Sequence, residues 1–385
     1  MLNCYAKTNA TIQQQEVIVL QPQEQSQGQL LEVIAEAPKN QASDNGFIQV
    51  KPAEVPKPLP PVSIQVEQNI FNRNFEKTFD EGIIKDASLI LGHDAMFNGF
   101  VPNAGHAHNT INNQVSLYGV KGHFRDGTIY NFSFAPFYDY PQYSNFEHRL
   151  FEYYVKRPID KHHQLTVGQQ RVPTTLDGCS SIFRLSTGRR SQFGNKYNNI
   201  TSIGAKVSGD WDRVEYQAGV FDTGRFLKDT FNSAPEFASL VSFKPIRNTQ
   251  KYGKLKTGGS YTVGQRETSY SVYSGHAIYD YKKAHVDFEY AYANGYNGRF
   301  LSAAKSYGYY STFMYDITPK VKAFYRFDTL NTNKSLAGKT TTEYTFGMHY
   351  YIKGNKARFT LSYIYANNQS TPDSNRFFSM LELLL

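Results

Sequence analysis

Several residue types and patterns are scarce in this chain, and each scarcity narrows the possible classes. The two cysteines, Cys4 and Cys179, form no CxxC spacing, so neither a disulfide scaffold nor a CxxC metal site is expected. No run of about eighteen apolar residues occurs, which excludes a protein that crosses a membrane by helices. No GxSxG motif, P-loop or Rossmann fingerprint appears in a suitable context. We therefore expect neither an enzyme nor a bound cofactor.

Tyrosine and phenylalanine, in contrast, are abundant, with 29 and 28 copies beside a single tryptophan. Many of them alternate with polar residues. In 341–352, Tyr344, Phe346 and Met348 fall on one face of an extended chain and Glu343 and Thr345 on the other. Strands of soluble sandwiches are shorter, at about five or six residues. Strands of about ten residues with one aromatic face predict an all-β transmembrane barrel, whose partners include outer-membrane lipids.

Sixteen segments show this pattern, and we predict an antiparallel β-barrel of about 16 strands. The predicted strands are 87–97, 115–124, 128–138, 148–157, 164–171, 201–209, 213–222, 237–244, 254–264, 269–280, 284–294, 305–316, 320–329, 341–352, 356–367 and 376–385. Connections after even-numbered strands are mostly short. Those after odd-numbered strands are mostly long, among them 98–114, 172–200 and 295–304. This asymmetry is typical of bacterial outer-membrane barrels, with both barrel ends of the chain in the periplasm.

The chain before the barrel differs in composition. Residues 1–61 are rich in Gln and Pro, which predicts a disordered periplasmic tail, with a possible signal-peptide remnant at 1–10. Residues 62–86 form a transitional segment, and 87–385 form the barrel domain. The tail is a candidate for contact with peptidoglycan or another envelope partner.

The charge of the chain is concentrated in the predicted barrel. Residues 1–86 contain 7 Lys and Arg against 11 Asp and Glu, whereas residues 87–385 contain 34 against 22. A basic surface can indicate nucleic acid, but this composition and strand pattern favour a membrane barrel without a nucleic-acid partner. Inside a barrel, positive charge favours the passage of small anionic solutes.

Strand direction and alternation place a set of basic residues inside the barrel near its periplasmic mouth. This predicted anion path consists of Lys206, Arg213, Lys254, Lys256, Lys320, Lys322, Lys356 and Arg358, with Arg326 nearer mid-height. Inward carboxylates at the same height are fewer: Glu215, Asp287, Glu289 and Glu382. In the alternative interpretation, lysines near strand ends simply mark the membrane–water boundary.

The longest connection, 172–200, is also basic. It holds Arg184, Arg189, Arg190 and Lys196 with only Asp177 opposing them. Such a loop either folds into the lumen as a constriction, where Arg can bind phosphate or carboxylate, or forms a basic, solvated surface. His93, His106 and His108 lack a further ligand at fixed spacing, so no metal site is predicted.

Two segments resemble a known family. LTVGQQRVPTTLDG at 165–178 and GDWDRVEYQAGVFDTGRF at 209–226 are similar to the phosphate-selective porin O and P family, with weaker similarity over about 115–385. The resemblance implies a sixteen-stranded, homotrimeric channel of the bacterial outer membrane with an anion-favouring lumen. Members that conduct phosphate line the path with arginines and lysines. Lysines outnumber arginines here, which favours general anion passage over phosphate selectivity.

The function predicted from the sequence is therefore that of an outer-membrane porin. It would form a water-filled channel for the passive diffusion of small hydrophilic solutes, with a preference for anions that can include phosphate. One alternative is a surface receptor or adhesin barrel with a plugged lumen. Another is a soluble all-β protein that binds polyanions.

Overall fold

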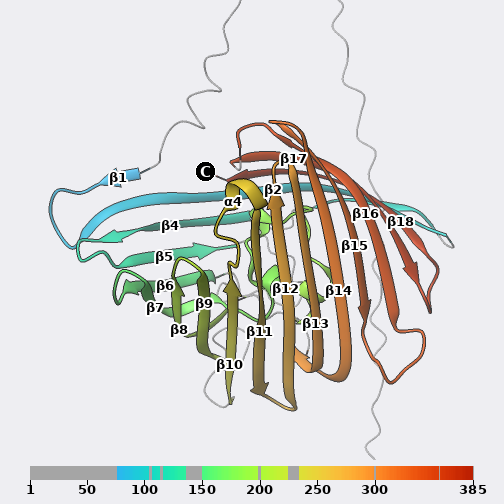
Figure 1. Ribbon diagram of the computed structural model, residues 1–385, viewed down its shortest axis with the longest axis horizontal. Coiled ribbons are helices and arrows are strands. Elements are labelled where there is room, and N and C mark those ends of the chain that lie inside the picture. The colour runs from blue at the N-terminus through green and yellow to red at the C-terminus, as the bar shows by residue number, and fades with distance from the viewer. Residues whose placement is uncertain are drawn as a thin grey trace, which may run out of the picture. The chain divides into compact units, whose positions relative to one another are not determined.

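Strands dominate the computed structural model (Figure 1), which describes residues 76–103, 106–112, 116–135, 150–197, 201–223, 234–298, 301–354 and 356–384. The strands are β1 (Glu76–Thr78), β2 (Ile84–Pro102), β3 (His108–Asn112), β4 (Ser116–Phe124), β5 (Ile129–Phe134), β6 (Leu150–Pro158), β7 (His163–Arg171), β8 (Thr201–Asp210), β9 (Val214–Asp222), β10 (Pro235–Phe243), β11 (Lys254–Gln265), β12 (Ser269–Tyr281), β13 (Ala284–Asn297), β14 (Leu301–Thr318), β15 (Val321–Asn331), β16 (Thr340–Tyr351), β17 (Ala357–Asn368) and β18 (Ser374–Leu384). The predicted tail 1–61 and most of the transitional segment 62–86 lie outside the described residues, and the proposed domain division stays a prediction.

The strands form a closed antiparallel barrel of sixteen strands, as predicted. Each strand pairs with its neighbours in the sequence, and β18 pairs with β2 from Ser374↔Pro102 to Leu384↔Gly92. That pairing closes the sheet and satisfies the backbone groups that an open edge would leave exposed to lipid. All sixteen predicted segments correspond to barrel strands, including 87–97, which lies within β2.

Two short strands supplement the barrel. β3 pairs with residues 96–100 of β2 and β4 pairs with residues 84–93, so β3 and β4 follow one another along the same side of β2. On its other side, β2 pairs with β1 over Asp86–Ser88. These residues precede Gly92–Pro102, the part of β2 that pairs with β18. The long strand β2 therefore extends beyond its pairing with β18, and β1 covers part of that extension.

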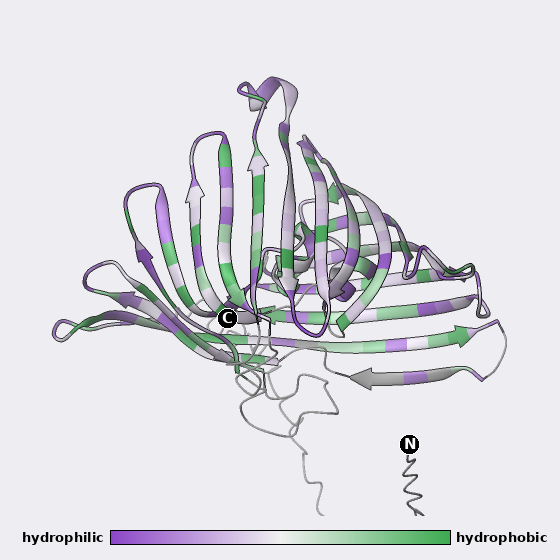
Figure 2. Ribbon diagram, turned by 90° about the horizontal axis from the view of Figure 1, so that it is seen from below, coloured by the Kyte–Doolittle hydropathy of each residue, from purple (hydrophilic) through white to green (hydrophobic). Residues whose placement is uncertain are grey.

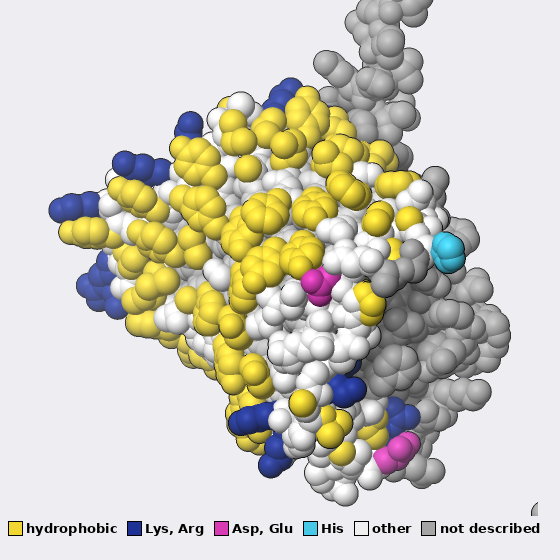
Figure 3. Space-filling model, turned by 90° about the vertical axis from the view of Figure 1, so that its right-hand side faces the viewer, with side chains coloured by type: hydrophobic (Ala, Val, Ile, Leu, Met, Phe, Trp, Pro, Cys, Tyr) yellow, Lys and Arg dark blue, Asp and Glu magenta, His cyan; other side chains and the backbone are white. Residues whose placement is uncertain are grey.

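Successive side chains of a strand point to opposite surfaces of the sheet, and Figure 2 shows bands of hydrophobic and hydrophilic residues following one another along the strands. On β13, Phe288 and Tyr290 are exposed on the outer surface while Asp287 and Glu289 are buried inside, which confirms the predicted facing. β12, whose alternation is poor, places Tyr270 and His276 inside. Figure 3 shows hydrophobic side chains over much of one outer face, with Lys and Arg at its margins. An apolar outer surface of this kind is suited to lipid.

The connections follow the predicted asymmetry with two exceptions. Residues 98–114 and 295–304 were predicted to be long loops, and this is wrong for most of their length, because β2 runs to Pro102 and β14 starts at Leu301. Gly295, at φ +74°, lies at a register shift between β13 and β14. This local irregularity lets the β13–β14 ladder continue beyond the polar residues that suggested a loop. No helix in the described part of the chain is long and apolar enough to span a membrane.

Candidate functional site

The connection between β7 and β8 folds back into the barrel. Its described part, residues 172–197, is called the inner loop here. It contains α2 (Leu176–Cys179), the 3-10 turn η2 (Ile182–Arg184) and α3 (Gln192–Tyr197). Figure 1 draws these helical turns in green behind β11–β13. The inner loop forms hydrogen bonds to inward-facing residues on β11, β13, β15, β16 and β17.

Carboxylates on the barrel wall hold the two α-helical turns of the inner loop. The backbone N–H groups of Leu176 and Asp177 donate to Glu289 Oε1 and Oε2 at 2.6 and 3.0 Å. The N–H of Gln192 donates to Asp328 Oδ2 at 2.8 Å. Both contacts pair a negative charge with the N-terminal N–H groups of a helical turn, which otherwise lack partners. These wall carboxylates therefore act on the loop rather than on solute.

Two arginines of the predicted anion path lie beneath the inner loop. Arg326 is 3% exposed and donates to the carbonyl oxygen of Arg189 at 2.9 Å. Arg358 is 7% exposed, donates to the carbonyl oxygen of Leu185 at 3.0 Å, and binds both carboxylate oxygens of Glu382. The structure thus brings these two arginines to the interface between loop and wall.

Apolar contacts fix the inner loop on two further sides of the lumen. Phe183 of η2 packs into a cluster with Leu117, Ala135 and Phe151 on the side of β4–β6. On the opposite side, the rings of Phe193 and Tyr310 stack with centroids 5.7 Å apart. The inner loop therefore has both hydrophobic and polar anchors, and it occupies much of the lumen beside β13–β18.

The basic residues of the inner loop are placed differently from one another. Arg184 is exposed, whereas Arg190 is 6% exposed and donates to the carbonyl oxygens of Asp177 and Ser180. Arg189 stacks over the Phe378 ring, and burial lowers the pKa of its guanidinium. Lys196 is half-buried, and desolvation lowers the pKa of its ammonium. Among these four predicted constriction residues, Arg184 presents its charge most openly to solvent.

A cavity of about 270 Å³ remains on the lumen side of β6–β9, and we call it the wall cavity. Its lining residues are Glu152, Tyr154, Lys156, Thr166, Gln170, Arg171, Lys206, Ser208 and Gln217. Arg171 and Glu152 form an ion pair at 2.7 Å. Lys206 Nζ donates to Gln217 Oε1 at 3.1 Å, and Lys156 makes no ion pair with a described residue. The wall cavity therefore carries an excess of positive charge from two lysines.

A larger cavity of about 990 Å³, the mouth cavity, lies near the short-turn end beside α4 (Thr249–Tyr252). It is lined by Asp212, Arg213, Glu215, Lys244, Ile246, Arg247, Thr249, Lys254, Leu255, Lys256, Ile278 and Asp280. Glu215 binds Lys244 at 2.5 Å and Lys256 at 3.3 Å, and the hydrogen bond that Lys244 donates to Glu215 raises the pKa of the lysine. Arg213, Arg247 and Lys254 make no ion pair within the described segments.

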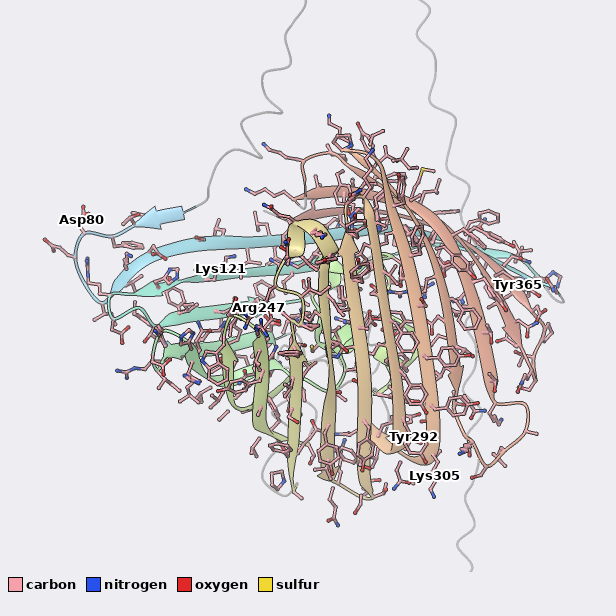
Figure 4. All side chains as sticks on the ribbon, in the orientation of Figure 1. Asp80, Lys121, Arg247, Tyr292, Lys305 and Tyr365 are labelled. Atoms are coloured by element: carbon pink, nitrogen blue, oxygen red, sulfur yellow. The ribbon has the colours of Figure 1, made fainter. Side chains whose placement is uncertain are left out.

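Four of the predicted path residues line these cavities: Lys206 lines the wall cavity, and Arg213, Lys254 and Lys256 line the mouth cavity. Lys320, Lys322 and Lys356 lie on the short turns and strand ends of β14–β17, with Lys322 paired to Asp316 at 3.2 Å. The cavities add Arg171, Lys244 and Arg247, which the sequence did not single out. Figure 4 shows Arg247 beside α4, far from Tyr292 and Lys305 at the other ends of β13 and β14. Lys244 and Arg247 lie in a connection that strand alternation does not orient.

No metal site was predicted. The structure brings His93 Nδ1 within 2.8 Å of Ser116 Oγ, and within the described ranges no group of three or more His, Cys, Asp or Glu side chains could hold a metal ion. The polar groups of the lumen in these segments are ammonium, guanidinium, carboxylate, amide, hydroxyl and imidazole groups, the last from His276 and His349.

Comparison with protein-family models gives one match, the phosphate-selective porin O and P family, over residues 247–377. The family resemblance is confirmed. The matched stretch contains α4, β11–β17 and the first residues of β18. It is separate from the two motifs at 165–178 and 209–226 that suggested this porin family. A search of curated protein sequences finds no match.

Solved structures support the same porin fold. The barrel is similar to an anion-selective porin from Comamonas acidovorans, with a TM-score of 0.58 and 10% identity, covering 78% of this chain and 99% of that one. It is similar to OprB of Pseudomonas putida, with a TM-score of 0.58 and 8% identity over 78% and 94% of the two chains. It is also similar to OmpT of Vibrio cholerae, with a TM-score of 0.56 and 13% identity, covering 80% of this chain and 100% of that one. These structures show the fold, and together with the match to the porin family model they support a place in the bacterial outer membrane.

Proposed function

We propose that this porin conducts small hydrophilic solutes passively across the outer membrane and favours anions. The observation that carries the proposal is the succession of the mouth cavity and the wall cavity, both rich in basic side chains, beside an inner loop that fills the opposite part of the lumen. A solute that passes the loop on this side meets Lys254, Lys256 and Arg213 and then Lys206 and Lys156.

Electrostatics gives this path its preference. Positive charges around a narrow aqueous route raise the local concentration of anions and lower their entry barrier. Glu289 and Asp328 accept hydrogen bonds from the inner loop and do not line either cavity, whereas Glu215 pairs with Lys244 and Lys256 inside the mouth cavity. The net positive charge of the path therefore comes from Arg213 and Lys254 in the mouth cavity and from Lys156 and Lys206 in the wall cavity.

Passive diffusion needs no covalent step and no cofactor. The outer surface contacts lipid, and the channel assembles as a homotrimer, as the family resemblance implies. Phosphate is one candidate solute among small anions. The N-terminal tail is proposed to contact peptidoglycan or another component of the cell envelope.

The test is single-channel recording of the purified, folded protein in a planar bilayer. Discrete conductance steps are expected, and heat-modifiable mobility on gels serves as the control for folding. A folded barrel that gives no steps would contradict a channel and support a receptor with a plugged lumen. A protein that stays soluble without detergent would contradict the membrane barrel itself.

A further inference from the structure

Two polar atoms of the residues that line the wall cavity have no hydrogen-bond partner among the described protein groups. Thr166 Oγ1 and Gln170 Oε1 are buried and have no hydrogen-bond partner in the described part of the chain. Both residues line the cavity, at 3% and 2% exposure. Buried polar atoms are normally paired with protein, water or a ligand. These two atoms therefore point to a bound partner in the cavity.

The orientation of the Gln170 amide is set by its surroundings. Gln170 Nε2 donates to the carbonyl oxygens of Thr166 and Gly204 at 3.0 and 3.2 Å. Two carbonyl acceptors require the NH₂ group at this position, so Oε1 is left as an acceptor. Gly168 pairs with Gly204 across β7 and β8 and has φ +122°, a conformation that favours glycine. A Cβ on Gly168 or Gly204 would collide with the carbonyl oxygen of Tyr153 or Val220 on the neighbouring strand, so both positions need glycine.

Positive charge flanks the Thr166 hydroxyl. Lys156, Thr166 and Lys206 are direct cross-strand partners on β6, β7 and β8. Directly opposed residues have Cβ atoms about 4.5–5.5 Å apart, so both ammonium groups can reach a solute beside Thr166. Arg171 does not compete for this solute, because its guanidinium binds Glu152 and the carbonyl oxygen of Ser180.

We propose that the wall cavity is a binding site for a small oxyanion that also carries a hydroxyl hydrogen. The lysines pair with the oxyanion, the Thr166 hydroxyl donates to it, and the solute hydroxyl donates to Gln170 Oε1. An α-hydroxycarboxylate and a hydrogen phosphate share this chemistry. The inference rests on the proposed anion path and adds the feature by which the path discriminates among anions.

The test uses two pairs of anions that differ in the hydroxyl hydrogen: glycolate against acetate, and phosphate against sulfate. Each is added to the wild-type channel in a planar bilayer, and the concentration that halves the chloride current is measured. The hydroxyl-bearing member should block at a concentration about three- to tenfold lower, which corresponds to one net hydrogen bond. A difference in the first pair supports an organic solute, and a difference in the second supports phosphate.

Two glutamines of the same cavity provide a matched comparison. Gln170→Met should abolish the difference within the pair and leave block by acetate or sulfate nearly unchanged. Gln217→Met, which removes an acceptor already occupied by Lys206, should change both members of a pair alike. Thr166→Val supplies a second variant in case the loss of the Gln170 amide prevents folding. It removes the hydroxyl that donates to the oxyanion, so it should weaken block by both members of a pair alike.

Equal block within both pairs by the wild-type channel would overturn the proposal, because water would then suffice to pair the two buried atoms. A retained anion-selective current would leave the proposed function intact in that case. No block by any anion, together with no anion selectivity, would reject both. A hydroxyl preference that survives Gln170→Met, or block by every anion that Thr166→Val leaves unchanged, would also overturn the assignment of the site.

Discussion

Basic residues of the lumen differ in what their charges contact. Arg326 and Arg358 are almost fully buried and donate to carbonyl oxygens of the inner loop. Lys156 and Lys206 instead line an open cavity. A buried, paired guanidinium mainly holds the inner loop in position and acts little on a solute, because neighbouring carboxylates and carbonyls offset its charge. The lysines are thus the residues expected to act on a passing anion.

Replacement of these two lysines should weaken anion selectivity. At about 5 Å in a high dielectric, one charge changes the local anion concentration by about fourfold. In Lys156→Gln with Lys206→Gln, the zero-current potential in a salt gradient should move toward the value for cations. Lys334→Gln, at an exposed position of the β15–β16 connection, serves as the control. An unchanged potential in the double variant would show that the wall cavity is not on the path.

The thiol of Cys179, on α2 of the inner loop, reports on the packing of that loop. Burial raises its pKa, so a smaller fraction is thiolate at neutral pH than in a free cysteine. In Cys4→Ser protein, maleimide labelling of Cys179 should be slower than that of a free thiol at pH 7. The labelling rate should rise as the pH increases toward the raised pKa. Labelling as fast as that of a small free thiol would indicate an open loop.

At the scale of elements, α2 depends on a partner that is distant in the sequence. Glu289 lies 113 residues from Leu176, whose N–H it accepts. In Glu289→Gln, the amide NH₂ would oppose a backbone N–H, and one charge-assisted hydrogen bond, about 1.5–3 kcal/mol, would be lost. Labelling of Cys179 should then accelerate by about ten- to a hundredfold, and the open-channel current should become noisier. The exposed Glu267→Gln should alter neither.

The facing of β13 makes a second prediction at this scale. Phe288 is on the outer surface at 41% exposure. An arginine on the lipid-facing side near the membrane midplane costs about 2–4 kcal/mol. Phe288→Arg should therefore reduce the folded fraction in a heat-modifiability or urea titration. Ser208→Arg, which lines the aqueous wall cavity, should have a smaller effect. Equal destabilisation by both would contradict the assigned facing.

Local pattern was sufficient to predict every barrel strand, because side-chain alternation is a property of consecutive residues. It was also sufficient to identify Lys206 and Lys256 as inward-facing. The inner loop was harder, because its position depends on pairs such as Leu176 with Glu289 and Gln192 with Asp328 that are far apart in the chain. For the same reason, the sequence could not separate Arg326 and Arg358 from the lysines that line cavities.

At the scale of the whole molecule, closure and charge act together. Pairing of β18 with β2 isolates the lumen from lipid. The inner loop then fills the lumen along β13–β18 and leaves the basic cavities near β6–β12. The barrel therefore needs no charged ring around its whole circumference. In the proposed path, the basic residues on one side of the wall provide the anion selectivity.

The zero-current potential of the wild-type channel in a planar bilayer with a salt gradient tests this account most directly. Purified, folded protein in potassium chloride should give a potential with the sign of chloride permeation, and the potential should decline as salt screens the basic cavities. A potential near zero, or one with the sign of potassium permeation, would contradict the anion path.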